Sequence, residues 1–214
     1  MDTLAITRRT MLGGSAALGL MGTGVGAGPA RAAFDPSPFF SGKAQDHGFT
    51  YNRSNVAAID PVWQRQLVEH EHHEAPGTVI VDTQNHFLYV TFENNTALRY
   101  GVGVGLEGFK WFGRATVARK AIWPGWTPPP EMLKRRPDLP RHMAGGPDNP
   151  LGPRALYLYR DGTDLGYRLH GTLEPWTIGT DASSGCVRLL PEDVMDLYQR
   201  TPVGTAVLVL KHIR

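Results

Sequence analysis

The chain of 214 residues contains one cysteine, Cys186, in the stretch TDASSGCVRLL (180–190). A solitary thiol is usually a small buried hydrophobe. His170, which ends the stretch YRLH, supplies an imidazole that could take the proton of a thiol whose free pKa is about 8.5. We expect this imidazole or a helix N-terminus to lower the thiol pKa and yield a thiolate. Residue types alone leave a catalytic and a structural cysteine as equal alternatives.

The residues around Cys186 offer the other parts of an acyl-transfer site. Gly185 leaves room for backbone N–H groups to point at a developing oxyanion. Arg188, two residues beyond the cysteine, could hold a substrate carboxylate by two hydrogen bonds. His170 is expected at a strand end and Cys186 just before a helix, and such ends often meet at a cleft.

Two other patterns are weaker. The glycines of GVGLEG (103–108) match the spacing of a dinucleotide-binding loop, but the following FKWFGRATV favours loop and strand over the helix that the motif requires. We therefore expect these glycines to serve turns. HEHHE (70–74) is dense in possible zinc ligands, yet no thiolate and no spaced ligand from a second element accompany it. The sequence therefore predicts neither a metal nor a cofactor, and HEHHE is interpreted as a solvated polar stretch.

The N-terminus predicts export. TRRTML (7–12) is a twin-arginine pattern, and a weakly apolar Gly/Ala-rich run and the small-residue signal ARA (30–32) follow it. We interpret residues 1–32 as a signal peptide, with a mature chain that starts near Ala33 in the periplasm. No segment is apolar and long enough to span a bilayer permanently.

The charge balance excludes one class of partner. Residues 1–32 hold three of the 22 basic and one of the 20 acidic residues, so the remainder is close to neutral. A nucleic-acid-binding protein needs a basic face, and none is indicated. About 180 residues remain, enough for one domain with a sizeable core. The single cysteine has no disulfide partner within the chain.

Hydrophobic alternation predicts one mainly β (α+β) domain with two short helices. Residues 33–74 are expected to form an arm, irregular as far as Asn55, and a short helix that begins at Asp60. Pro191 is expected to start a second helix. A proline-rich loop (123–154) separates the strands and contains a helical turn at PEMLKRR. The expected strands are TVIVDT and HFLYVTFE joined by a hairpin turn, TALRYGVGVG, ALYLYR, YRLHGT and TAVLVLK.

Several of these stretches resemble a known family. YRLHGT, followed sixteen positions after His170 by Cys186 in SSGCVRL, is similar to the signature of the L,D-transpeptidase catalytic domain of the YkuD or ErfK type. The similarity runs from about Ala75 to Leu210. Its further blocks, in order, are PGTVIVDTQNHFLYV, YGVGVGLEGFKWFG, ARKAIWPGWTPPPEM, GGPDNPLGPRALYLY, GTDASSGCVRLLPEDVMDLY and VGTAVLVL.

The resemblance implies a catalytic domain over 75–214 that is mostly β, with twisted sheets or a sandwich and a few short helices, and with the sheet wrapped around the catalytic loop. It also implies roles in peptidoglycan synthesis, cell wall biogenesis and cell shape. By this resemblance Cys186 is the nucleophile, His170 is the proton acceptor and later donor, and the backbone carbonyl of Gly171 orients the imidazole. The N–H groups of Gly185 and Cys186 would form the oxyanion hole. The residues expected to bind substrate are Arg188, Ser183, Ser184, Thr172 and Trp126.

Ser184 departs from the pattern, because many members have a second histidine at this position, just before the Gly-Cys pair. Other members of the ErfK type also lack it, so the departure leaves catalysis by His170 possible and puts in doubt a mechanism that uses two histidines. The loop that contains Trp123 and Trp126 is either a lid over the acyl site or a packed structural loop. The sequence leaves both interpretations open.

The activity implied by the resemblance is a two-step acyl transfer on the tetrapeptide stems of peptidoglycan. Cys186 attacks the diaminopimelate carbonyl, D-Ala leaves, and an amine resolves the thioester. The amine could belong to a second stem, to the lysine of an envelope lipoprotein or to a free D-amino acid. Water as acceptor would make the protein an L,D-carboxypeptidase. Two further alternatives are a non-catalytic peptidoglycan-binding module and a cysteine peptidase acting on proteins.

Overall fold

A computed structural model describes residues 34–71, 73–106 and 111–211. The predicted signal peptide (1–32) and its cleavage site lie outside the described residues, as do one histidine of HEHHE and the end of GVGLEG. Asp35–Arg214 form one structural unit, and this unit contains every element of the fold.

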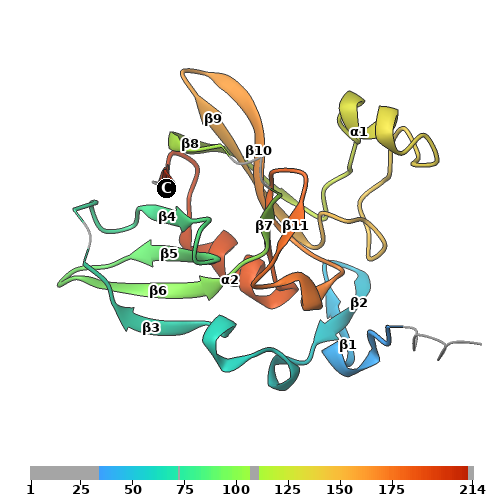
Figure 1. The fold of residues 1–214 in the computed structure, drawn as a ribbon, viewed down its shortest axis with the longest axis horizontal. Helices are drawn as coiled ribbons and strands as arrows, with labels where there is room; N and C mark the ends of the chain where they lie inside the picture. Colours follow the sequence, from blue (N-terminus) through green and yellow to red (C-terminus); the bar gives the residue numbers. More distant parts are fainter. Residues whose placement is uncertain (1–33, 72, 107–110, 212–214) are drawn as a thin grey trace, which may run out of the picture. The chain divides into compact units, whose positions relative to one another are not determined.

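Strands outnumber helices, and the α-helices lie between strands in the chain, as the sequence predicts (Figure 1). The strands are β1 (Phe40–Asp46), β2 (Phe49–Ser54), β3 (Gln66–Glu69), β4 (Val79–Asp82), β5 (Phe87–Thr91), β6 (Thr96–Gly101), β7 (Val104–Gly105), β8 (Gly113–Ile122), β9 (Arg154–Arg160), β10 (Thr163–Gly171), β11 (Asp181–Ser183), β12 (Val187–Leu189) and β13 (Ala206–Val209). The α-helices are α1 (Pro130–Arg135) and α2 (Pro191–Arg200), and short 3-10 turns cover Ser37–Phe39, Val56–Ala58, Pro61–Trp63 and Pro175–Thr177. The prediction of a mainly β fold with a few short helices is confirmed.

Within the described residues, one sheet of nine strands has the order β12-β10-β9-β8-β13-β4-β5-β6-β3. The pairs β10/β12 and β13/β4 are parallel, and the other neighbours in this sheet are antiparallel. Strands β1 and β2 form a separate hairpin, and β7 pairs with β11. The predicted hairpin between the first two core strands is confirmed as β4 and β5.

The core lies between the inner face of the sheet and α2. Val194 and Leu197 of α2 are fully buried, and they join the same apolar cluster as Leu88 of β5, Leu156 of β9 and Leu169 of β10. Because strand side chains alternate between faces, each of these strands sends every second residue into the core and leaves the residues between them for the other face. The outer face of β8, β9, β10 and β12 is thus available for chemistry.

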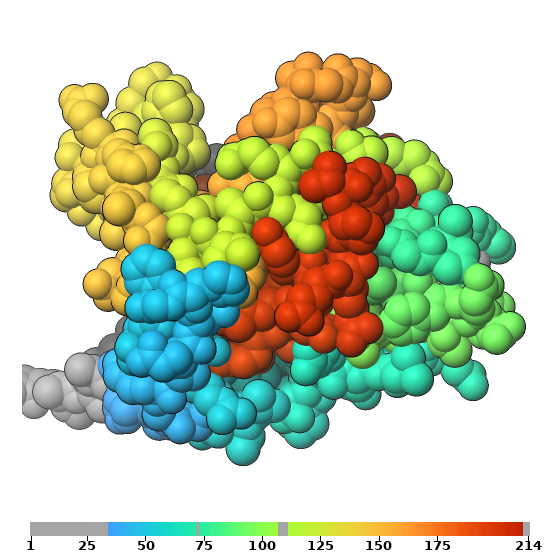
Figure 2. Space-filling model, turned by 180° about the vertical axis from the view of Figure 1, so that it is seen from behind, coloured from blue at the N-terminus to red at the C-terminus, as the bar shows by residue number. Residues whose placement is uncertain are grey.

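The segment predicted to be an irregular arm is a hairpin, and that prediction is wrong. Asp46 at the end of β1 accepts two hydrogen bonds from Arg154 of β9, at 2.7 and 2.9 Å, and one from the Trp123 indole at 2.8 Å. The backbone N–H of Ser54 in β2 donates to Glu192 of α2 at 3.2 Å. Figure 2 shows the hairpin, in blue, lying against α2, in red. Polar side chains therefore dock this hairpin, which is why its hydrophobic pattern is weak.

The helix predicted from Asp60 is also wrong beyond its first turn. Asp60 caps the turn by accepting a hydrogen bond from the backbone N–H of Val62 at 3.0 Å, with Pro61 at the first position. The chain then extends into β3, which pairs with β6. Backbone pairing at the edge of the sheet overrides the helical spacing of these residues. Leu67 on β3 is 66% exposed, so no packing of an apolar helix face opposes this pairing.

The prediction that the glycines of GVGLEG serve turns is wrong for the two that the structure describes, Gly103 and Gly105. Gly103 bridges to Arg188 of β12, and Gly105 in β7 lies against the loop before Cys186. A Cβ on Gly103 would come within 2.7 Å of the Thr177 carbonyl oxygen, and a Cβ on Gly105 within 2.7 Å of the Gly185 Cα. These two glycines therefore permit close backbone packing behind the catalytic loop. No helix in the described parts of the chain is long and apolar enough to cross a membrane.

Candidate active site

The outer face of the sheet carries Cys186 at the end of a row of side chains. Arg119 of β8 is directly opposite Tyr157 of β9, and Tyr157 is directly opposite Arg168 of β10. The parallel register of β10 and β12 places Cys186, immediately before β12, beside Arg168. We call Arg119, Tyr157 and Arg168 the Arg–Tyr–Arg row. A row of side chains from β8 and from the consecutive strands β9 and β10 therefore leads across the sheet to the thiol.

His170 lies two residues further along β10 than Arg168, on the same face. It is opposite Ala155 of β9 on one side and Arg188 of β12 on the other. The imidazole thus stands in a second row, roughly 7 Å along the strands from the first. His170 and Cys186 also line one cavity of about 120 Å³. The sheet register brings the two predicted catalytic residues together.

The His170 side chain is held by its neighbour in the chain. Its Nδ1 lies 2.6 Å from the carbonyl oxygen of Gly171. A carbonyl can only accept, so Nδ1 carries the proton and Nε2 is left to receive one from the thiol. This is the geometry that the orienting role of Gly171 requires. A Cβ on Gly171 would come within 2.7 Å of Pro153, so only glycine fits here without a shift.

The electrostatics favour a neutral pair over the expected thiolate. Burial lowers the pKa of His170 to about 4; the Gly171 hydrogen bond opposes this change, and the Arg188 and Arg168 cations add to it. Burial raises the pKa of the Cys186 thiol, against the opposing effects of Arg168 and Arg188. The imidazole therefore does not yield a resting thiolate. Cys186 precedes strand β12 and not a helix, so a helix N-terminus does not act on it either.

The loop before Cys186 is held by Ser183. The Ser183 hydroxyl donates to the Cys186 carbonyl at 2.5 Å and accepts from the Gly185 N–H at 3.2 Å. Ser183 is 4% exposed, so it braces the loop from within. The Gly185 N–H therefore has a partner in this structure, and the oxyanion hole of Gly185 and Cys186 stays a prediction. Gly185 adopts φ +120°, which disfavours any other residue at this position.

The cavity that holds Cys186 and His170 is lined by several predicted substrate-binding residues, which are Ser183, Ser184, Arg188 and Trp126. Arg188 forms an ion pair, in which its Nη1 donates to Glu174 Oε2 at 2.7 Å. Thr172 does not line this cavity. It lines two neighbouring cavities and accepts a hydrogen bond from the Glu174 N–H at 3.0 Å. A guanidinium has five N–H donors, so the pair with Glu174 leaves donors of Arg188 for a substrate carboxylate.

A second cavity, of about 320 Å³, lies on the other side of Cys186 and is lined by Arg119, Tyr157 and Arg168. Sequence reasoning did not select these three residues. Arg168 could have been found, because it precedes His170 by two positions in a predicted strand and must share its face. Arg119 and Tyr157 reach the site only through strand register, which the sequence does not state.

The proline-rich loop contributes its two tryptophans differently. Trp126 lines both cavities beside Cys186 and pairs with Met143 through two backbone hydrogen bonds of 2.8 Å. Trp123 is 7% exposed and packs against Phe49 and Tyr51 of the hairpin. Trp123 is therefore a packed structural residue, while Trp126 occupies the position that a lid would need. Whether the loop moves stays a prediction.

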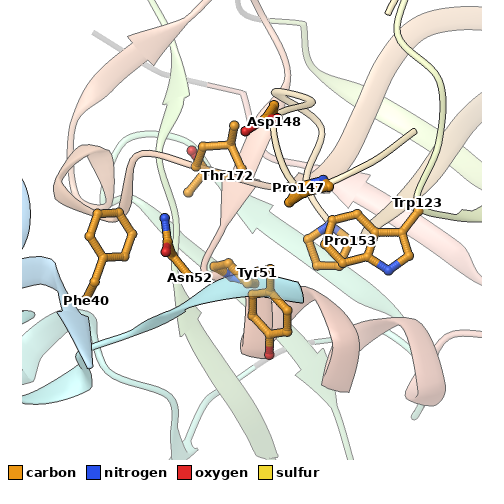
Figure 3. Close-up of a pocket in the computed structure, with 10 residues that line it drawn as sticks. Phe40, Tyr51, Asn52, Trp123, Pro147, Asp148, Pro153 and Thr172 are labelled. Carbon is orange, nitrogen blue, oxygen red and sulfur yellow. The ribbon is translucent and has the colours of Figure 1, made fainter. Parts of the chain in front are cut away.

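Trp123 also borders a separate cavity of about 110 Å³ between the hairpin and the sheet (Figure 3). Figure 3 shows the rings of Phe40 and Tyr51 on the hairpin side and Thr172 on the other. Cys186 does not line this cavity. It therefore marks the joint between the hairpin and the catalytic part of the chain.

The described residues contain no group of three His, Cys, Asp or Glu side chains placed to hold a metal ion. Of the HEHHE stretch, His70 stacks on the Tyr89 ring, with centroids 4.1 Å apart. Glu74 forms a bidentate ion pair with Arg114 at 2.6 and 2.8 Å. These two members thus have structural partners from neighbouring strands.

Comparison with known proteins identifies relatives of this fold and site. The family model described as the L,D-transpeptidase (YkuD) catalytic domain matches residues 76–209. The probable L,D-transpeptidase ErfK/SrfK of Escherichia coli K12 is 35% identical over 142 residues, which cover 63% of this chain and 44% of that protein. The chain spans about half the length of the curated relatives it matches first.

Two solved structures are also similar. The Ldtfm–avibactam carbamoyl enzyme has a TM-score of 0.50 at 16% identity, covering 65% of this chain and 51% of its own, and it supports the fold alone. A crystal structure from Brucella melitensis, titled a probable carnitine operon oxidoreductase, is 46% identical and covers 73% of this chain and 99% of its own. Its TM-score of 0.49 is too low to bear on function.

Proposed function

Because this chain belongs to the L,D-transpeptidase (YkuD) catalytic-domain family, we propose that it is a transpeptidase that acts on peptidoglycan tetrapeptide stems through a Cys186 thioester. One observation carries the proposal. Cys186 and His170 line the same cavity, and the Gly171 carbonyl fixes the imidazole tautomer that leaves Nε2 for the thiol proton. Thiol, base and orienting group are the parts that nucleophilic acyl transfer requires.

In the first step, the neutral thiol loses its proton to His170 Nε2 as sulfur attacks the carbonyl carbon of diaminopimelate. The raised thiol pKa and the lowered imidazole pKa favour this coupled transfer over a preformed ion pair. The C–N bond to D-Ala then breaks, and the D-Ala nitrogen takes the proton from His170. A thioester on Cys186 and a neutral imidazole remain.

In the second step, an amine attacks the thioester carbonyl and gives its proton to His170, the C–S bond breaks, and the thiolate recovers the proton. The acceptor is an amine of a second stem, of a lipoprotein lysine or of a free D-amino acid. Trp126 lines the cavity. In this proposal its indole limits access of water, which would otherwise hydrolyse the thioester. With water as acceptor the same steps would give an L,D-carboxypeptidase.

The proposal includes a location. The substrate is part of the cell wall, and the twin-arginine pattern at residues 7–12 offers a route of export, so we place the enzyme in the periplasm. An envelope lipoprotein is then a possible partner as acceptor, in addition to the stem peptides themselves.

The test is to incubate residues 33–214 with purified disaccharide tetrapeptide and to follow the products by mass spectrometry, with Cys186→Ala as the matched control. We expect a cross-linked dimer that has lost one D-Ala, formed only when Cys186 is present. His170→Ala should lose the same product, because no other described group in the cavity is placed to take the thiol proton.

The other outcomes decide between the remaining alternatives. Tripeptide as the sole product, again dependent on Cys186, would favour the carboxypeptidase. Unchanged substrate, together with binding to peptidoglycan, would favour the non-catalytic module. Cleavage of ordinary peptides made of L-residues would instead indicate a cysteine peptidase.

A further inference from the structure

The cavity of about 320 Å³ beside Cys186 is lined by the thiol and by the Arg–Tyr–Arg row, whose side chains take no part in the proton transfers of the two acyl-transfer steps. Two of its side chains, Arg119 and Arg168, carry guanidinium groups. Both lie against the ring of Tyr157, with the guanidinium carbons 3.4 Å and 4.5 Å from the ring centroid. Stacking on an aromatic ring fixes a guanidinium without using its hydrogen-bond donors. The row therefore presents oriented donors next to the nucleophile.

The two arginines differ in how their charge is balanced. Arg168 forms a bidentate ion pair with Asp164, at 2.7 and 2.9 Å, across a bulge in β10 at Gly166. Within the described part of the chain, Arg119 makes no ion pair of its own, and it is exposed. Arg119 therefore keeps N–H donors that could bind a ligand, whereas Arg168 is already paired with Asp164. Such a site suits a carboxylate.

The chemistry of the reaction indicates which carboxylate would bind to this row. In a two-step transfer, the leaving amine and the incoming amine occupy the same place relative to the acyl carbon, because each step is the reverse of the other in geometry. D-Ala, the leaving group, bears a carboxylate one carbon from its nitrogen. The D-centre of diaminopimelate and every free D-amino acid bear one at the same distance. A lysine ε-amine has none.

Building on the proposed transpeptidase function, we infer that the Arg–Tyr–Arg row is a carboxylate subsite for the leaving D-Ala and for the acceptor, and that it selects α-amino carboxylates as acceptors. The enzyme then forms cross-links and exchanges D-amino acids in preference to attaching a lipoprotein lysine. The row itself forms and breaks no covalent bond, and it supplies only binding and orientation.

The test compares acceptors that differ in the carboxylate alone. Wild-type enzyme is incubated with disaccharide tetrapeptide as donor and with D-methionine and D-methioninamide together, and mass spectrometry measures the ratio of the two exchange products per unprotonated amine. We expect a preference for D-methionine of about tenfold or more, the usual effect of a charge-assisted hydrogen bond. Nα-acetyl-lysine should be as poor as the amide. Equal rates with all three amines would overturn the inference.

Arg119→Gln should bring the preference close to one, because D-methionine loses the partner of its carboxylate and the amide has no such partner to lose. Formation of the acyl-enzyme, which releases D-Ala, should slow equally for both acceptors. Arg119→Lys, which keeps the charge, should retain part of the preference. Arg114→Gln is the matched control, because Arg114 is on the same strand, is exposed and does not line the cavity. It should behave as wild type. An unchanged preference of Arg119→Gln for D-methionine over the amide would contradict the inference, whatever the activity of the variants.

The same assay separates this inference from the proposed function. Transfer to any amine that depends on Cys186 supports the transpeptidase, whatever the preference. If the wild-type enzyme transferred to no amine, the proposed function would fail and the acceptor subsite with it. Donor effects cancel, because both acceptors compete for one acyl-enzyme.

Discussion

Cys186 and His170 form a resting pair without charge at neutral pH. Burial produces this state, since it disfavours both the thiolate and the imidazolium. The thiol donates weakly to the Gly166 carbonyl, with sulfur and oxygen 4.0 Å apart, which also favours the protonated form. In the proposed mechanism, a neutral pair protects the thiol until a carbonyl carbon arrives, because attack and proton transfer then occur together. The proposal thus couples reactivity to substrate binding.

The lowered imidazole pKa gives a prediction for the pH dependence of kcat/KM. His170 must be neutral to accept the thiol proton, and burial brings its pKa to about 4. Activity should therefore rise with pH through about 4 and be level from about pH 5 to 7, where an ordinary histidine would still be titrating. The measurement is the pH profile of tetrapeptide turnover. An acidic limb centred near 6.5 would contradict the buried neutral imidazole.

Residues that belong to a local motif could be predicted from the sequence. Residues that become neighbours only through the pairing of strands could not. Cys186 and His170 were selected from residue type and from the motif around them. Arg119 and Tyr157 are 38 positions apart and become neighbours only when β8 pairs with β9. The register of this pairing depends on a bulge between Val117 and Arg119, and no local sequence pattern predicts that bulge.

Among the elements, the short pair β7 and β11 supports the loop that carries Cys186, the proposed nucleophile. Ser183 ends β11, and its register partner is Gly105 of β7. The absence of a side chain on Gly105 lets the backbone of Gly185 approach it closely. The catalytic loop is thus pressed between β7 and the cavity, and its position depends on a glycine far from it in sequence.

Gly105→Ala should displace that loop. The added Cβ would lie 2.7 Å from the Gly185 Cα and 3.0 Å from its nitrogen, so backbone must move. We expect a loss of turnover of roughly a hundredfold from misplacement of Cys186, and a loss of about 1–3 kcal/mol in unfolding free energy from overpacking. Turnover and urea unfolding check this, with the exposed neighbour Leu106→Ala as control. Wild-type turnover in Gly105→Ala would show that the loop does not depend on this contact.

Strands were predictable where one face is buried in the core. In β9, ALYLYR alternates leucines that enter the core with residues of the outer face, and the period of two is plain. In β1, FSGKAQD has no buried face, since its burial ranges from intermediate to exposed. Its pairing rests on hydrogen bonds and on Asp46, which leave no hydrophobic period. The misjudged hairpin is therefore a limit of pattern reasoning on polar strands.

For the molecule as a whole, the structural unit is larger than the family domain. The family model matches 76–209, whereas the structural unit begins at Asp35. The additional hairpin closes over Arg154, which is 6% exposed, and over Trp123. Without Asp46 the Arg154 guanidinium would be a buried cation without its carboxylate. The hairpin is therefore part of what stabilises the sheet that carries the catalytic residues.

The stability of the whole unit should accordingly depend on the charge of Asp46. Its hydrogen bonds from Arg154 bring the pKa of Asp46 to about 2 in the folded state, below the ordinary value of about 3.9 in the unfolded chain. A carboxyl with a lowered pKa stabilises the fold above its unfolded pKa, and the contribution is lost as pH falls from about 4 to 2. Asp46→Asn should therefore lower the unfolding free energy by about 2 kcal/mol at pH 7.

Urea unfolding of wild type and Asp46→Asn at pH 7 and at pH 2 measures this contribution, and Asp161→Asn, in an exposed loop, serves as the control. The difference between wild type and Asp46→Asn should be largest at pH 7 and should nearly close at pH 2, where the wild-type carboxyl is itself becoming protonated. A difference that stayed constant with pH would mean that Asp46 acts through shape and not through charge. The hairpin would then be held mainly by the packing of Phe49 and Tyr51 against Trp123.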